Sequence, residues 1–166
     1  MAGKKVEVKF ESKLLNKLLR NMKKNAYVKV GILSSNDARS EETKGNAYIG
    51  AVHEFGLKNS EGKTAIPKRS FLKMPLQDDF DNALGKKGDV KELAKDLVKD
   101  PRQFFDKLGN IAVGVITEAF DRGGSTKTAW ASLNPEYAKT KKVQQILVET
   151  QQLRESITYE VEGDFQ

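Results

Sequence analysis

The chain has 166 residues, of which 38% are hydrophobic and 31% are charged, and its formal net charge is +6. This balance excludes a disordered chain, and the length predicts one domain over residues 1–166. The lack of cysteine excludes disulfides, thiolate metal sites and cysteine nucleophiles. No apolar run could span a bilayer and no signal peptide is visible, so we expect no membrane contact and a place in the cytosol or in a particle assembled there.

The first part of the chain predicts a strand, a helix and a second strand. Residues 6–10 alternate between apolar and charged side chains, the period of a strand with one buried face. A helix is expected from Ser12, a candidate N-cap, to about residue 24, because leucines recur on one face and basic residues on the other. Residues 26–32 alternate again and predict a second strand, which could pair with the first in either direction.

Two polar stretches flank a short predicted helix. Residues 34–46 and 57–65 contain little that could be buried, so we expect exposed, mobile loops. Between them, apolar residues at steps of three predict a helix over residues 49–55 that ends at Gly56, a residue suited to closing a helix. Loops of this length are often binding elements.

Three helices are expected next. The first covers residues 71–84, and Pro75 must either lie in its first turn or break it. The second covers residues 89–99. Asp100 and Pro101 are expected to end this helix and to precede a new one. The new helix covers residues 102–122 and is the strongest prediction, because its apolar residues recur at steps of three and four. We expect this helix to pack across the sheet as its main support.

The last part of the chain predicts a loop and a strand. Gly123 should end the long helix, and residues 123–142 are expected to form a long loop in which Trp130 is one of few anchors. Residues 157–161 alternate and predict a final strand that joins the N-terminal sheet. The predicted fold class is α+β, with a small, mostly antiparallel sheet packed by helices and with long mobile loops.

The sequence carries no recognisable catalytic constellation. His53 and Glu54 are similar to the start of the zinc-binding pattern His-Glu-x-x-His, but residue 57 is leucine and the chain has one histidine. We therefore expect both residues to hydrogen-bond the helix end and the loop after it. No nucleophile elbow or phosphate-binding glycine loop is present, so no enzyme activity, cofactor or metal is predicted. Asp78 and Asp79 are interpreted as solvated surface charge.

Two patches of the sequence together resemble a known protein family. One is His-Glu-Phe-Gly at residues 53–56, a variable polar loop, and Ile-Pro-Lys-Arg-Ser-Phe-Leu at residues 66–72. The other begins at Trp130 with Trp-Ala-Ser-Leu, continues through a run of lysines, and closes with Glu-Thr-Gln-Gln-Leu-Arg-Glu-Ser-Ile at residues 149–157. The combination resembles the tail-completion and head-tail joining proteins of long-tailed bacteriophages. That family usually has glycine where this chain has Gln151, so either a tight turn or a helix that continues past it is expected there.

The resemblance implies a non-enzymatic virion protein at the head-tail junction. Such a protein completes or terminates the tail, or joins it to the head connector, after assembly in the bacterial cytoplasm. The resemblance also implies a ring, commonly a hexamer built from subunits that can be monomeric when free. The tail tube protein and the neck proteins are the implied partners.

A closed ring needs two complementary patches on each subunit. The basic first predicted helix and the acidic residues 78–81 are the expected pair. Two interpretations of Arg69 and Phe71 remain open: Arg69 binds an acidic neighbour while Phe71 fills the core, or both anchor a subunit interface. The candidate interface residues are His53, Glu54, Phe55, Pro67, Arg69, Phe71, Trp130, Lys13, Lys17, Asp78, Asp79 and Asp81.

The alternative function is a basic protein that binds nucleic acid without sequence preference. The first predicted helix is rich in lysine and arginine, and Lys139, Lys141 and Lys142 follow Tyr137, so lysines beside an aromatic ring could track a phosphate backbone. DNA also passes through the neck of a phage, so weak, non-specific DNA contact is compatible with the structural role.

Overall fold

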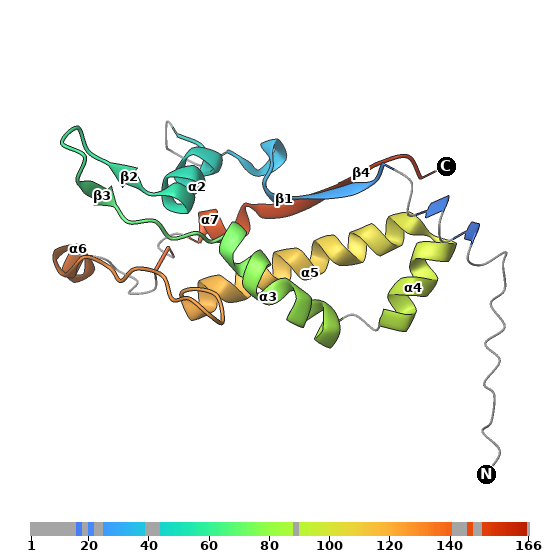
Figure 1. Cartoon of the computed structure of the whole chain (residues 1–166). Coiled ribbons are helices and arrows are strands. Elements are labelled where there is room, and N and C mark those ends of the chain that lie inside the picture. The colour runs from blue at the N-terminus through green and yellow to red at the C-terminus, as the bar shows by residue number, and fades with distance from the viewer. Residues whose placement is uncertain are drawn as a thin grey trace, which may run out of the picture.

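The computed structural model describes residues 16–17, 20–21, 25–38, 44–87, 90–140, 146–147 and 151–165. Helices and two small antiparallel sheets make up its regular structure (Figure 1). The elements are β1 (Tyr27–Ile32), the 3-10 helix η1 (Ser34–Asn36), α2 (Asn46–Phe55), β2 (Leu57–Lys58), β3 (Thr64–Ile66), α3 (Lys73–Lys87), α4 (Val90–Lys99), α5 (Pro101–Arg122), α6 (Pro135–Thr140), α7 (Gln152–Glu155) and β4 (Ile157–Glu162). The predicted α+β class is confirmed.

Helix α5 is the element on which most others pack. At its start, the Asp100 carboxylate accepts a hydrogen bond from the backbone N–H of Gln103 at 3.2 Å, and Pro101 occupies the first turn, where no N–H is needed. At its end, Gly123 takes the left-handed conformation, with φ 73° and ψ 36°. Helices α3 and α4 and strands β1 and β4 all contact α5, which confirms the predicted supporting helix.

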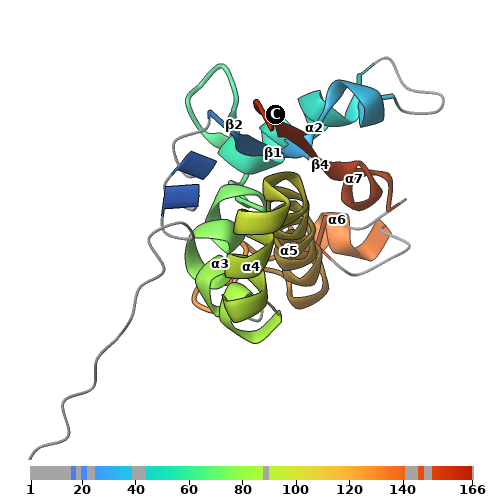
Figure 2. The same ribbon diagram turned by 90° about the vertical axis from the view of Figure 1, so that its right-hand side faces the viewer.

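The main sheet consists of β1 and β4. They pair in antiparallel register, with Tyr27 opposite Glu162 and Ile32 opposite Ile157. Figure 2 looks nearly along α5 and shows this sheet on one side of the helix, with α3 and α4 on another. The prediction that the last strand joins the strand at residues 26–32 is therefore confirmed. The predicted first strand, at residues 6–10, lies outside the described residues.

The core gathers where α5 ends and α3 begins. Phe71 and Phe120 are both fully buried and meet edge to face, with ring centroids 5.4 Å apart at 65°. Trp130 packs on Phe120 in the same manner, at 5.5 Å and 83°. The other buried members are Ile116, Ala119, Leu153 and Ile157. Removing one buried aromatic side chain of this kind costs about 3–5 kcal/mol, and the expectation that Phe71 fills the core is confirmed.

A close approach joins α5 to β4. Gly109 is buried on α5, and a Cβ atom at this position would overlap the ring of Tyr159, which lies on β4. The amide Nδ2 of Asn110 donates a hydrogen bond to the Tyr159 hydroxyl at 2.9 Å. Glycine is therefore required where the ring lies directly on the helix.

All three stretches predicted as loops contain regular structure, and in residues 34–46 this includes the 3-10 helix η1. Residues 57–65 belong to an antiparallel hairpin of β2 and β3, held at its turn by the Asn59 side chain, which accepts from the backbone N–H groups of Glu61 and Lys63 at 3.1 and 2.9 Å. Helix α6 occupies part of the predicted 123–142 loop. Both elements are too short to produce a clear periodic pattern in the sequence.

Helices α3 and α4 agree with the prediction. Pro75 lies in the first turn of α3 and is fully buried, and α4 begins within one residue of the expected position. Of the helices in the described ranges, none has the length and apolarity that a bilayer crossing would need.

Candidate functional site

The carboxylate of Glu54 joins the end of α2 to the start of α3. It is buried, with 7% of the residue exposed, and it accepts hydrogen bonds from the Ser70 hydroxyl at 2.6 Å, from Leu72 N at 3.0 Å and from Lys73 N at 3.4 Å. These N–H groups belong to the start of α3, where a negative charge is stabilised by the helix dipole. The carbonyl of His53 accepts from Arg69 N at 2.7 Å. The expected hydrogen bonds to the following segment are confirmed for the Glu54 side chain, whereas the contact of His53 with Arg69 is made by its backbone carbonyl.

Arg69 holds the segment that follows Trp130. Its Nε and one terminal nitrogen donate to the carbonyl oxygens of Ala131 and Ser132 at 2.8 and 2.9 Å. The expected acidic partner is therefore wrong, because the planar guanidinium fork is filled by two backbone acceptors. Burial of Arg69 without a carboxylate lowers its pKa.

Trp130 closes this joint from the other side. Its indole N–H donates to the Ser70 carbonyl at 3.2 Å, while its ring lies in the core. Glu54, Arg69, Phe71 and Trp130 are thus consumed by contacts within the chain and leave little side-chain surface for a partner. We call these four residues the joint, because they connect α2, α3 and the segment after α5.

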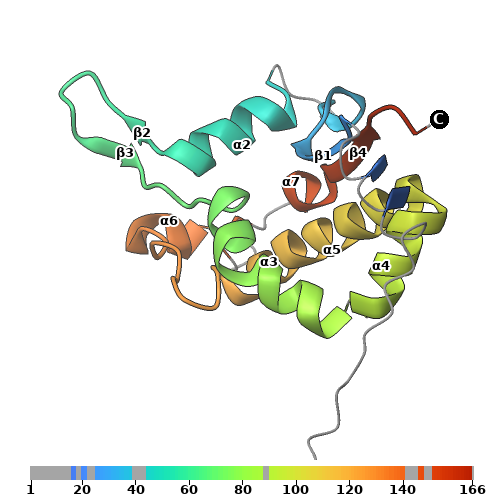
Figure 3. The same cartoon turned by 45° about the vertical axis from the view of Figure 1, so that its right-hand side comes forward.

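The joint supports an exposed end of the molecule. Phe55, the last residue of α2, is 75% exposed, and Leu57 at the start of the hairpin is 44% exposed. The hairpin projects at the end of the molecule farthest from α4 (Figure 3). Gly56 reverses the chain with φ 78°, and a Cβ there would lie 3.0 Å from Lys68 N and 3.1 Å from the Ile66 carbonyl oxygen.

A hollow of about 360 Å³ opens at this end. Its lining combines apolar side chains with lysines at the edge, and consists of Phe55, Gly56, Leu57, Lys58, Thr64, Ile66 and Lys68. We call Phe55, Leu57 and this hollow the hairpin end. Phe55 and half-buried Pro67 are the predicted interface residues that belong to this region. The sequence pattern did not single out Leu57 or the hairpin.

The acidic residues 78–81 do not form the expected solvated patch. Asp79 is 6% exposed, binds an Arg122 terminal nitrogen at 2.8 Å and accepts from Thr126 N at 3.1 Å. Asp78 accepts from the Ser125 hydroxyl at 2.5 Å. The interpretation as surface charge is wrong for this pair, because α3 and α5 pack side by side and bring both carboxylates to the turn after α5. Asp81 alone of the three predicted aspartates is exposed.

The basic N-terminal segment is described at a few positions. Lys13 lies outside the described residues, whereas Lys17 is helical and exposed. Asn21 is buried and its amide donates to the Leu97 carbonyl at 2.7 Å, which places this segment against the C-terminal end of α4.

A groove beside the main sheet is apolar. An open groove of about 310 Å³ between the sheet, α3 and α5 is lined by Val28, Val30, Leu76, Phe80, Phe105, Leu108 and Ala112. These walls are apolar and contain no acid, base or nucleophile that could act on a substrate. Within the described ranges, no three carboxylate or imidazole side chains come together as a metal-binding set.

Gln151 shows which of two expected arrangements the chain adopts. Its φ is 62°, a left-handed conformation, and helix α7 begins at the next residue. The tight turn is therefore present although the side chain is not glycine. Leu153 and Ile157, which follow in the same patch, are buried in the core beside Phe71.

Comparison of the chain with protein-family models, with curated proteins and with solved structures finds no match. The functional inference therefore depends on the residue pattern and on the geometry of the joint and the hairpin end.

Proposed function

We propose that this chain is a structural protein of a tailed-phage virion, acting at the head-tail junction as one subunit of a ring. It would complete or terminate the tail, or join it to the head connector, with the tail tube protein and the neck proteins as partners. The proposal rests first on the sequence pattern, whose two patches are about 60 residues apart in the chain.

The convergence of these patches supports the proposal. The Arg69 fork binds the carbonyls next to Trp130, and the Trp130 indole binds the carbonyl next to Phe71. The two patches of the sequence pattern, residues 53–72 and residues 130–157, thus contact each other in this chain, and these contacts attach the hairpin end to the core. A rigid projection loses little conformational entropy when it docks.

The single observation that carries an assembly role is the exposure of Phe55. A phenylalanine ring that is 75% exposed, beside a 44% exposed leucine, is a poor solvent-facing surface but a suitable interface anchor. Burying such a ring at an interface contributes about 2 kcal/mol, and a closed ring repeats this contribution at every subunit contact.

This site replaces the expected pairing of the basic first helix with residues 78–81. Asp78 and Asp79 are bound to Ser125 and Arg122 within the chain, so they are not available as a complementary patch. A head-to-tail contact made by the hairpin end requires no charge pairing with these residues.

Deletion of the gene from the phage or prophage that encodes it tests the role. We expect electron microscopy to show filled heads beside separate tails, with overlong tails for a terminator and tails of normal length for a joining protein. Intact infectious particles would overturn the proposal.

Complementation of the deletion with Phe55→Ser tests the site. We expect the same assembly defect as in the deletion, with a normally folded purified protein. Tyr27→Ser is the matched control, because Tyr27 is also an exposed aromatic residue, at 50%, but lies on the β1–β4 sheet. A defect with the control and none with Phe55→Ser would place the interface elsewhere.

A further inference from the structure

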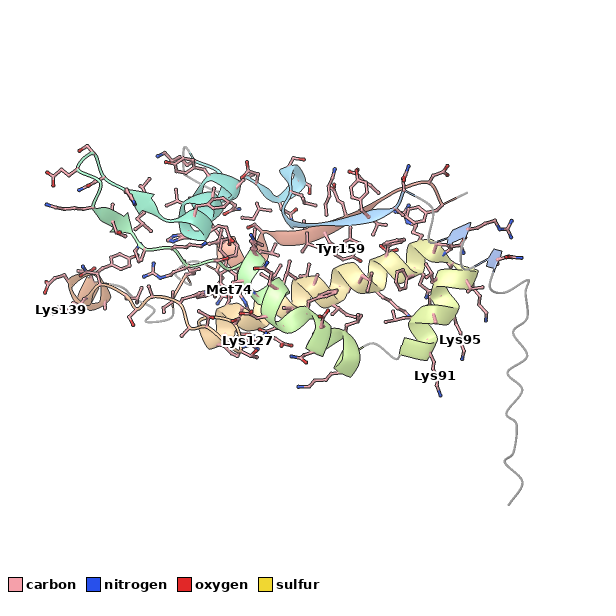
Figure 4. All side chains as sticks on the ribbon, viewed as in Figure 1. Met74, Lys91, Lys95, Lys127, Lys139 and Tyr159 are labelled. Atoms are coloured by element: carbon pink, nitrogen blue, oxygen red, sulfur yellow. The ribbon has the colours of Figure 1, made fainter. Side chains whose placement is uncertain are left out.

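The outer surface of α4 carries a regular row of lysines. Lys91, Lys95 and Lys99 recur every four residues and are all exposed, while Leu93 and Val98 on other faces of the helix are buried. At a rise of about 1.5 Å per residue, successive lysines are about 6 Å apart and the row is about 12 Å long. Figure 4 shows Lys91 and Lys95 pointing away from the body of the molecule.

The acidic residues of the same helix turn toward α5. Glu92 and Asp96 both contact the ammonium group of Lys107, at 3.2 and 2.6 Å. These carboxylates raise the pKa of Lys107, chiefly through the hydrogen bond that Lys107 donates to Asp96. Lys107 therefore partly neutralises both carboxylates of α4, of which Asp96 is 13% exposed and Glu92 is 63% exposed. With three exposed lysines and one exposed carboxylate that already contacts Lys107, the outer face of α4 carries an excess of positive charge.

Two more basic residues extend the row. The amide of Asn21 donates to the carbonyls of Leu97 and Val98 at 2.7 and 3.5 Å, so the N-terminal segment meets α4 at its C-terminal end. Lys17 precedes Asn21 by about one helical turn and Arg20 directly precedes it, and both basic residues are exposed. We call Lys17, Arg20, Lys91, Lys95 and Lys99 the lysine face.

We propose that the lysine face binds the phosphate backbone of duplex DNA without sequence preference. Ammonium groups act as point charges that neutralise phosphates and release condensed counterions, which is the main source of non-specific DNA affinity. An acidic protein surface is less well matched, because a protein interface needs apolar or aromatic anchors at its centre and the row on α4 presents none. The inference does not depend on the role at the head-tail junction.

The test is the salt dependence of DNA binding by the full chain. Fluorescence anisotropy with a labelled duplex of random sequence would measure the association constant from about 50 to about 200 mM salt. Replacing Lys91, Lys95 and Lys99 together by glutamine, which has a similar helix propensity, should reduce the slope of log K against log salt by about 2.7. This reduction in slope corresponds to about 0.9 for each of the three phosphate contacts that the variant loses.

The matched control removes the same charge from the hairpin end. Lys58, Lys63 and Lys68 are exposed, and their joint replacement by glutamine should leave the slope unchanged within about one. An equal loss of slope in both triple variants would show that net charge alone matters and would overturn the proposal. No measurable binding of the unaltered protein to the duplex at about 50 mM salt would overturn it as well.

A single-residue variant and an acidic peptide complete the test. If the triple variant on α4 does not fold, Lys95→Gln alone should reduce the slope by about 0.9. A labelled polyglutamate peptide distinguishes the partner class: binding to the peptide with the same dependence on the lysine face, and none to the duplex, would overturn the proposal in favour of an acidic protein. The Phe55→Ser variant should bind DNA normally, so failure of the assembly role and failure of this inference give different results.

Discussion

Truncation of Glu54 to alanine tests the joint directly. The change removes a carboxylate that accepts from the Ser70 hydroxyl at 2.6 Å and from Leu72 N at 3.0 Å, with a longer contact to Lys73 N at 3.4 Å. A hydrogen bond to a charged group contributes about 1.5–3 kcal/mol, and a buried donor left unsatisfied costs a similar amount. The Ser70 hydroxyl still accepts from Met74 N at 3.1 Å, so the start of α3 keeps part of its capping.

We therefore expect Glu54→Ala to lower the free energy of unfolding by about 3 kcal/mol. Glu54→Gln keeps the shape and one acceptor oxygen, and should lower it by about 1–2 kcal/mol. For a chain of this size, a loss of about 3 kcal/mol corresponds to a fall of about 6–12 °C in the melting temperature.

Urea unfolding followed by tryptophan fluorescence measures this effect. Trp130 is the single tryptophan, is 5% exposed, and belongs to the joint itself. The midpoint should move to lower urea with an unchanged slope, since the exposed area in the unfolded state does not change. Glu61→Ala is the control, because Glu61 pairs with Lys63 on the exposed hairpin and its side chain is 66% exposed.

A double-mutant cycle of Glu54→Ala with Ser70→Ala isolates the pair. Residues that share a buried hydrogen bond are expected to couple by about 0.5–3 kcal/mol. If Glu54→Ala unfolds within about 0.5 kcal/mol of the Glu61→Ala control, the carboxylate does not hold α2 to α3 and the argument for the joint fails.

Three further predictions concern other parts of the chain. Gly109→Ala forces the added methyl group into the Tyr159 ring and should cost about 1–3 kcal/mol in the same urea assay, whereas Gly85→Ala, in open space on α3, should stabilise by about 0.5–1 kcal/mol; equal effects would refute the close approach. Phe55→Ser should leave the free energy of unfolding within about 0.5 kcal/mol of the unaltered chain, and a larger loss would mean that the ring belongs to the core. The hydrogen bond from Lys29 lowers the pKa of Glu162. This interaction should therefore stabilise the fold fully at pH values above the ordinary carboxyl pKa, and the stabilisation should be lost as the pH falls through the lowered pKa. Carboxyl NMR titration should show that lowered pKa, and Glu162→Gln should remove this part of the acid dependence.

The joint changes how the sequence pattern is understood. Glu54 and Arg69 are candidate interface residues in the sequence, which also predicts that Glu54 hydrogen-bonds the loop after its helix and leaves the partner of Arg69 open. In the folded chain they bind backbone groups and a serine hydroxyl of the same chain. The surface that remains for a partner is Phe55 and the hairpin, which these residues position.

Helix positions were predictable because their signals are local. The apolar period of α5, Asp100 and Pro101 at its start, and Gly123 at its end all lie within or next to the helix. The same holds for α4 and for the alternating strand β4. The hairpin was missed because strands of two and three residues carry too few side chains to show a period.

The functions of polar residues were less predictable than the helices. Asp78 and Asp79 appear in the sequence as an adjacent charged pair, and nothing next to them distinguishes solvated charge from a buried ion pair. The Arg122 and Thr126 groups that bind Asp79 are 43 and 47 residues away in the chain. Only the packing of α3 along α5 brings these groups together.

The sequence by itself determined the α+β class, the helices from residue 73 to residue 122 and the pairing strand at the C-terminal end, because helix caps and hydrophobic period act over a few neighbouring residues. The tertiary structure decided which polar residues are buried within the chain, that residues 57–66 form a hairpin, and that Phe55 remains exposed. It also brought Lys107 of α5 to Glu92 and Asp96 of α4, which partly neutralises these two carboxylates. Each of these outcomes depends on contacts between residues distant in the chain, and local sequence patterns do not encode such contacts.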